Sequence, residues 1–294
     1  MKTTSQRLRR AAETLEIRTR RHVTALLSGN SRSPFRGSGM QFKEFRHYEA
    51  GDDIRHMSWP VTARTGRATI KIYEEDRERD VVLLVDTSGS ALFSSQRGSR
   101  LEMFSDLVAV LGLSAVQGGD KFGVLHFSNK PVEFRPPRRN REQVLGAALK
   151  LLDLSPEGQP SDLRTTLSFL QTALKNRAIL FVISDFNLPD FRRELVALSR
   201  RHEVILLHAF DDWEQGRALP GGIVEAWDPE TQKFWLLDTS SRSTRTILEQ
   251  GYAQKVGYLN EVARLSRADY LGLCLQDDYL KKLVHFFNRR AMVR

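Results

Sequence analysis

Residues 81–90 read Val81-Val82-Leu83-Leu84-Val85-Asp86-Thr87-Ser88-Gly89-Ser90, and this stretch decides the fold class. A continuous run of five apolar residues, three of them valines, is typical of a strand buried in a parallel sheet. Three polar side chains, Asp86, Ser88 and Ser90, follow at alternate positions where the strand ends. Because open α/β sheets bind ligands at the carboxyl ends of their strands, these oxygens indicate a site for a small divalent cation.

A second apolar run, residues 178–183, also ends in polar residues, Ser184 and Asp185. From the first run onward, apolar runs alternate with amphipathic helical patterns. This alternation predicts an α/β fold with a doubly wound, mostly parallel sheet over residues 78–294. A β-hairpin insertion is predicted near residues 221–238. Residues 1–77 are predicted to form an N-terminal helix and a small β segment.

The spacing of Asp86, Ser88 and Ser90 at a strand end resembles the metal-ion-dependent adhesion site of von Willebrand factor A domains. The resemblance implies a von Willebrand A-like fold for the larger part of the chain. It also implies two more ligands from later loops, namely a hydroxyl at the start of a helix and an aspartate after another buried strand. Hard oxygen ligands of this kind suit Mg²⁺ or Mn²⁺ better than zinc.

The two later ligands fall in two segments of the sequence. Asp185 takes the position of the aspartate, and Ser161 takes that of the hydroxyl, with Thr165 and Thr166 as the alternatives. By resemblance, the hydroxyls bind the ion directly, the acids act mainly through bound waters, and an open position attracts a carboxylate from a partner protein. The predicted metal ligands are therefore Asp86, Ser88, Ser90, Ser161 and Asp185.

Residues 45–64 carry a second pattern, Arg-x-Tyr-x-x-Gly-Asp-Asp-x-Arg-x-x-x-Trp-x-x-x-Ala-Arg. It resembles the signature of a bacterial family, the domain of unknown function 58, whose members often accompany MoxR-type AAA+ ATPases. Ser58 replaces the acid that normally precedes the tryptophan. Opposite charges beside aromatic rings predict a structural network of ion pairs, with a partner-docking surface as the alternative. The residues of this network or surface are Arg46, Tyr48, Asp52, Asp53, Arg55, Trp59 and Arg64.

The net charge of +9 is concentrated at the N-terminus, where residues 1–36 hold nine Lys or Arg against two acids. An arginine-rich segment of this kind is either a solvated helix face or a site for nucleic acid or an anionic membrane. We find no apolar run of about 18 residues, so no membrane-spanning helix is expected. Cys274 is the single cysteine, which fits a reducing cytoplasm.

These patterns predict metal-dependent protein binding rather than catalysis. By resemblance, the partner is a MoxR-type AAA+ ATPase, for which the chain acts as an adaptor in the chaperone-like maturation of other complexes. No small-molecule substrate is expected. A phosphatase that uses Asp86 as its nucleophile is the enzymatic alternative, but such enzymes need a second aspartate as general acid where Ser88 stands.

Overall fold

The computed structural model describes residues 22–27, 40–49, 51–75, 78–92, 99–154, 161–228 and 233–293. Contacts divide the chain into two compact units: a large unit of Met1–Pro34 with Asp80–Arg294, and a small unit of Phe35–Arg79. Of the predicted N-terminal helix, residues 22–27 are helical, and the rest lies outside the described residues. The predicted domain boundary between residues 77 and 78 stays a prediction.

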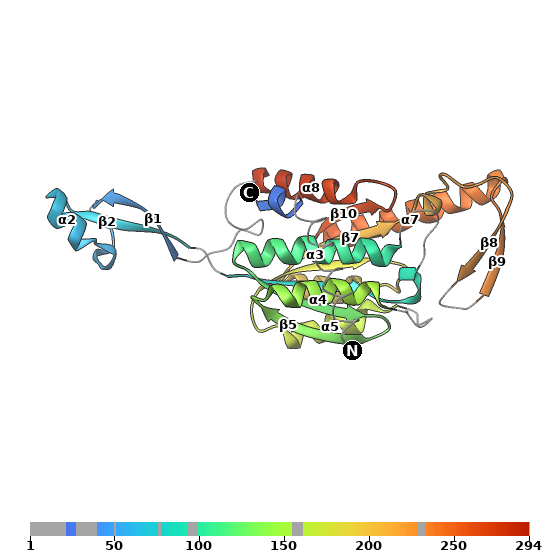
Figure 1. Cartoon of the computed structure of the whole chain (residues 1–294), viewed down its shortest axis with the longest axis horizontal. Helices are drawn as coiled ribbons and strands as arrows, with labels where there is room; N and C mark the ends of the chain where they lie inside the picture. Colours follow the sequence, from blue (N-terminus) through green and yellow to red (C-terminus); the bar gives the residue numbers. More distant parts are fainter. Residues whose placement is uncertain are drawn as a thin grey trace, which may run out of the picture. The chain divides into compact units, whose positions relative to one another are not determined.

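The large unit is built on a six-stranded sheet in the order β10-β7-β6-β3-β4-β5 (Figure 1). Strand β3 (Asp80–Asp86) lies between β6 (Ala178–Ser184) and β4 (Lys121–Phe127), and both pairs are parallel. Beyond β6, the sheet continues with β7 (Glu203–Phe210) and then β10 (Asp269–Cys274), and each runs parallel to the strand before it. Strand β5 (Pro131–Arg138) is an antiparallel edge. The predicted α/β class with a mostly parallel sheet is therefore confirmed.

Helices cover both faces of this sheet, as a doubly wound fold requires. Helices α5 (Leu163–Ala173), α6 (Arg192–Ser199) and α7 (Arg242–Ser266) pack against Val82 and Leu84 and their neighbours on one face. The opposite face carries α3 (Arg100–Gly118), α4 (Arg141–Leu152) and α8 (Tyr279–Val293). Here the Phe287 ring of α8 lies 5.9 Å from the Phe181 ring of β6.

Helix α3 is long and apolar enough to cross a membrane by length and composition alone. In the structure, 78% of its apolar window is buried inside the large unit, as in the core helix of a folded domain. The helix begins at a capping box, in which Ser99 and Glu102 each bind the other's backbone N–H.

The small unit pairs β1 (Met40–His47) with β2 (Thr69–Glu75) in an antiparallel ribbon. The connection holds a short 3-10 helix, η1 (Ile54–His56), and helix α2 (Trp59–Thr65). The sequence gives no periodic signal for α2 because the helix is only two turns long. Pro60 stands in its first turn, where a missing N–H costs no helical hydrogen bond.

The predicted insertion in the large unit is a two-stranded hairpin of β8 (Ile223–Asp228) and β9 (Lys233–Asp238). It forms a sheet of its own, separate from the six-stranded sheet. Two further 3-10 turns, η2 (Gly89–Leu92) and η3 (Asp212–Gln215), follow the ends of β3 and β7.

A close approach between α3 and α4 depends on Gly112. A Cβ at this position would lie 2.6 Å from Val144 Cγ1 and 2.9 Å from the Phe122 ring. We expect Gly112→Ala to lower the free energy of unfolding by about 1–3 kcal/mol, because overpacking outweighs the gain in helix propensity. Urea unfolding measures the effect. Gly257→Ala in α7 is the matched control: its Cβ would meet nothing within 4 Å, so it should be neutral or stabilising. Equal effects of the two variants would contradict this account of α3–α4 packing.

Candidate metal-binding site

The candidate site lies at the carboxyl end of the sheet, where β3 and β6 run side by side. Asp86 is the last residue of β3, Ser88 follows on the turn into η2, and Ser90 is the second residue of η2. The parallel register pairs Val85 with Ile183, so the chain that leaves β6 brings Ser184 and Asp185 next to Asp86. The topology therefore joins two segments that lie about one hundred residues apart in sequence.

The Asp86 carboxylate is the centre of the site and is 1% exposed. Its Oδ1 accepts from the backbone N–H of Ser88 at 3.0 Å, and its Oδ2 accepts from the Ser184 hydroxyl at 2.7 Å. The Ser161 hydroxyl lies 3.1 Å from both oxygens. All of these donors are neutral, so Asp86 is a buried carboxylate held by hydrogen bonds rather than by a direct ion pair.

The five predicted ligands come together in one chain of hydrogen bonds. Ser161 donates to Asp86, which also accepts from the backbone N–H of Ser88. The Ser88 and Ser90 hydroxyls lie 3.0 Å apart, and Arg100 Nη1 donates both to the Ser90 carbonyl and to Asp185. The structure thus places Asp86, Ser88, Ser90, Ser161 and Asp185 in a single cluster, while their role as metal ligands stays a prediction.

The structure also indicates which residue supplies the third hydroxyl of the cluster, beside those of Ser88 and Ser90. The Thr165 hydroxyl donates to the backbone oxygen of Asn129 at 3.3 Å, away from the cluster. The Thr166 hydroxyl is fully buried and bonds to none of the described residues. Ser161 is the candidate that contacts Asp86, so the geometry favours it over the two threonines.

Two residues of the site, Ser184 and Arg100, are not among the ligands predicted from the sequence. Ser184 immediately precedes Asp185, and its hydroxyl also accepts the backbone N–H of Phe186. Arg100 donates from Nη1 to Asp185 Oδ2 at 2.9 Å and to the Ser90 carbonyl at 2.8 Å, and from Nη2 to Glu214. It is 3% exposed. Arg100 stands inside the capping box of α3, where an arginine normally faces solvent, so no local pattern marks it.

The charges of the cluster leave room for a divalent cation. Its carboxylates are Asp86, Asp185, Asp211 and Glu214, and its cations are Arg100 and Lys255. The carboxylates exceed the cations by two. Among the described residues, no group of three or more His, Cys, Asp or Glu side chains is placed to hold a metal ion. Serine hydroxyls and water would therefore supply most ligands, which suits a hard ion such as Mg²⁺.

The two acids of the site titrate in opposite directions. Burial, followed by the nearby charge of Asp185, raises the pKa of Asp86 to about 6. Burial also disfavours ionisation of Asp185, but the charges of Arg100 and Lys255 and the backbone N–H of Asn187 together outweigh it and lower the pKa of that carboxyl. Asp86 is thus the acid whose charge lacks compensation.

The second predicted network lies in the small unit and is only partly an ion-pair network. Arg46 bonds Asp52 at 2.7 Å and Glu49 at 2.8 Å, and Asp53 caps η1 through the backbone N–H of Arg55. The network holds the turn that connects β1 to η1. The remaining signature side chains show no such role: Arg55, Trp59 and Arg64 are exposed, and Tyr48 is half-buried.

The family model described as "Protein of unknown function DUF58" matches residues 44–256. The chain belongs to the DUF58 family. Uncharacterized proteins of Mycobacterium bovis and Mycobacterium tuberculosis are 28% identical to it over 208 residues, which are 70% of this chain. The match spans 66% of the length of those relatives, so this DUF58 chain covers slightly less than two thirds of them.

Solved structures similar to this DUF58 protein share little sequence with it. BatB from Bacteroides thetaiotaomicron is 16% identical with a TM-score of 0.48, over 73% of this chain and 99% of that one. The VWA domain of SpRpn10 is 12% identical with a TM-score of 0.41, over 71% and 95%. A mussel byssus protein with a zinc-occupied MIDAS motif is 20% identical with a TM-score of 0.36, over 46% and 38%.

The raised pKa of Asp86 makes stability depend on pH in a direction that can be measured. The folded protein holds this proton up to a pKa of about 6, against 3.8 for the free side chain. The stability that Asp86 contributes in the metal-free protein is therefore present below about pH 4 and lost as pH rises towards 6. Asp86→Asn removes this titration, so its stability relative to wild type should rise by about 2 kcal/mol between about pH 4 and pH 7.

Urea unfolding in EDTA across this pH range measures the difference. Thr165→Ala removes a hydroxyl that lies away from the cluster and should keep the pH dependence of the wild type. A stability difference between Asp86→Asn and wild type that stays constant with pH would show that Asp86 is not the titrating group.

Proposed function

We propose that this DUF58 protein is a metal-dependent protein-binding module rather than an enzyme. One observation carries the proposal: five oxygen-bearing side chains from three separate loops form one cluster, and the carboxylates in and around this cluster exceed the cations by two. A buried carboxylate such as Asp86 is costly without a nearby positive charge. A bound cation would supply that positive charge, so metal binding would account for the buried carboxylate of Asp86.

The proposed ligands have distinct roles in this site. The hydroxyls of Ser88, Ser90 and Ser161 would hold Mg²⁺ or Mn²⁺ directly, and Asp86 and Asp185 would hold its waters. Bound there, the ion supplies a positive charge that a carboxylate of a partner protein can reach. Ser90 is half-buried while Ser88 and Ser161 are buried, so a partner would approach from the Ser90 side.

We propose a MoxR-type AAA+ ATPase as the partner, with an adaptor role in the chaperone-like maturation of other complexes and a cytoplasmic location. Membership of the DUF58 family supports this choice. The chemistry of the site supports it as well, because an ion with neutral ligands retains charge for an acidic side chain on the partner.

The two alternatives have less support. A phosphatase needs a proton donor beside Asp86, but the position two residues on is Ser88, whose hydroxyl is engaged with Ser90. The arginines proposed for nucleic acid or membrane binding, Arg7, Arg9, Arg10, Arg18, Arg20 and Arg21, lie outside the described residues.

Metal binding is tested with Mg²⁺ alone, by calorimetric titration and by thermal unfolding. We expect Mg²⁺ at about one hundred times its dissociation constant to stabilise the wild type by about 2.7 kcal/mol. Asp86→Ala should abolish this effect, and Ser161→Ala should weaken binding at least about tenfold, since each removes an oxygen from the cluster. Thr165→Ala is the matched control and should bind Mg²⁺ as the wild type does. Wild-type protein that shows no stabilisation with Mg²⁺ or Mn²⁺ would refute the site.

Partner binding is tested separately, by co-purification with the MoxR-type ATPase of the same organism in Mg²⁺ or EDTA. We expect the complex to be lost in EDTA and with Asp86→Ala, and to survive with Thr165→Ala, because only the first two conditions remove the ion. A complex that persists in EDTA would contradict a metal bridge.

A further inference from the structure

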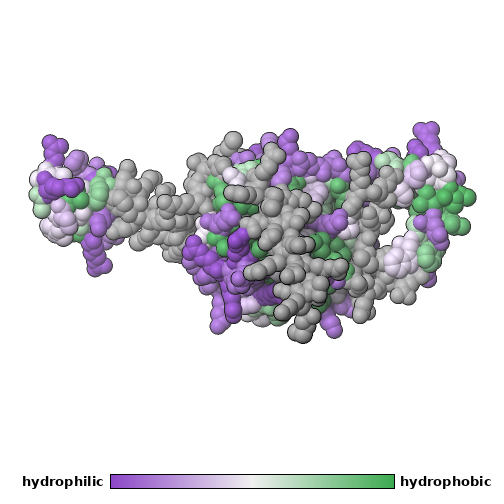
Figure 2. Space-filling view, in the orientation of Figure 1, coloured by the Kyte–Doolittle hydropathy of each residue, from purple (hydrophilic) through white to green (hydrophobic). Residues whose placement is uncertain are grey.

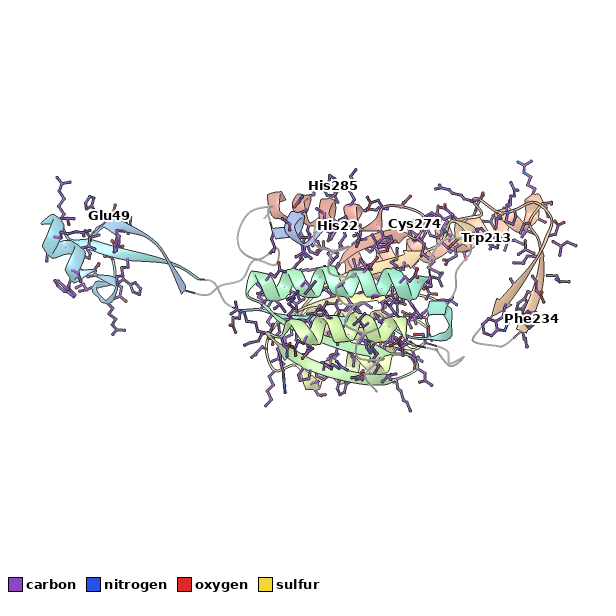
Figure 3. The ribbon with its side chains drawn as sticks, in the orientation of Figure 1. His22, Glu49, Trp213, Phe234, Cys274 and His285 are labelled. Atoms are coloured by element: carbon purple, nitrogen blue, oxygen red, sulfur yellow. The ribbon has the colours of Figure 1, made fainter. Side chains whose placement is uncertain are left out.

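The β8–β9 hairpin exposes more apolar surface than its own two strands can bury. Figure 2 shows hydrophobic atoms gathered over it, and Figure 3 labels Phe234 near its tip. Ile223 and Leu236 are 74% exposed, Phe234 is 64% exposed, and Trp227 is 47% exposed. A two-stranded hairpin is marginally stable by itself in water. A patch of this kind marks an interaction site.

The register places these side chains on one side of the ribbon, which we call the hairpin face. Cross-strand pairs join Ile223 to Asp238, Glu225 to Leu236 and Trp227 to Phe234, and the last two rings lie 6.5 Å apart. The hairpin face therefore consists of Ile223, Glu225, Trp227, Phe234, Leu236 and Asp238. It holds two carboxylates and no basic residue. Two copies of this face would bring like charges together, so its chemistry fits a basic, partly apolar surface.

The small unit presents a surface with the opposite charge. Helix α2 packs on β2 through Val61 and Thr62, and the Thr62 hydroxyl accepts the backbone N–H of Thr69. Trp59 and Arg64 remain on the outer side of α2, and Trp59 is 64% exposed. In η1, Ile54 and Arg55 are also exposed. We call these four residues, Ile54, Arg55, Trp59 and Arg64, the signature face.

The two arginines of the signature face are available for binding. Arg55 and Arg64 form no ion pair within the described residues, unlike Arg46, which bonds Asp52 and Glu49. Trp59 is 64% exposed, so most of its ring does not contribute to the packing of the small unit. Tryptophan and arginine are also the side chains that most often dominate the binding energy of protein interfaces.

We propose that the hairpin face of one copy of this protein binds the signature face of a second copy. The charges are complementary, with Glu225 and Asp238 on one face and Arg55 and Arg64 on the other. Both faces carry aromatic rings on which a guanidinium can stack. With side-chain areas of about 150–250 Å² per aromatic residue, the two faces expose roughly 800 Å² of apolar surface together. That area places the contact in the class of weak, reversible interfaces.

This contact is head-to-tail, because the two faces differ and every copy carries both. Heterologous contacts that join each copy to a different neighbour produce rings or open chains, whereas a reciprocal exchange of the two faces between two copies gives a closed dimer. The contact uses none of the residues of the metal-binding cluster, so self-association and metal binding are expected to be separable.

The experiment is sedimentation velocity of the full chain over a range of micromolar concentrations, in EDTA and at low and high ionic strength. We expect the wild type to self-associate with concentration, and to do so less at high salt. Arg64→Glu and Glu225→Arg should each weaken association at least about tenfold, because each variant has one repulsive face. Arg138→Glu, on the edge strand β5, is the matched control for the change in charge and should associate as the wild type does. Circular dichroism checks that every variant is folded.

Mixing the two interface variants gives the decisive result. Arg64→Glu keeps an intact hairpin face, and Glu225→Arg keeps an intact signature face. An equimolar mixture should therefore associate, although neither variant does so alone. A wild type that stays monomeric, variants that associate like the wild type, or a mixture that stays monomeric would each overturn the proposal.

Discussion

The pairing of β3 with β6 is the constraint on which the rest of the site depends. Both strands are completely buried along their apolar residues, so their register is fixed by the packing of helices on both faces of the sheet. That register puts Asp86 beside Ser184 and Asp185 with little freedom to adjust. A site assembled on two central strands of a rigid sheet holds its oxygens more precisely than one assembled on loops alone.

The fold was predictable because its signals are local. The apolar runs that become β3 and β6, the capping box at Ser99, and the predicted hairpin can each be recognised within about ten residues of sequence. Buried central strands of a parallel sheet appear in the sequence as continuous apolar runs. The polar residues that follow such a run mark the carboxyl end of the strand. Helix α2 was missed because two turns around Pro60 are too short to show a period of 3.6 residues.

The residues of the candidate site could be predicted only where they directly follow a buried strand or precede a helix. Asp86, Ser88, Ser90 and Asp185 directly follow apolar runs, and Ser161 precedes a helix, so pattern and resemblance together locate them. Arg100 and Glu214 lie 114 residues apart, and they meet only because α3 begins near the point where β7 ends. Side-chain pairs of that separation depend on the complete tertiary structure, and no short window of sequence contains them.

The position of Arg100 has a consequence for how tightly an ion would be held. Asp185 already has a permanent counter-charge, because the buried guanidinium bonds it and Glu214 at once. An incoming cation therefore gains less from Asp185 than it would from an unpaired acid, and part of its binding energy is offset by repulsion from the guanidinium. An ion bound at this site would therefore exchange with the surrounding solution instead of being retained permanently. Occupancy of the site would then follow the free concentration of the metal in its compartment.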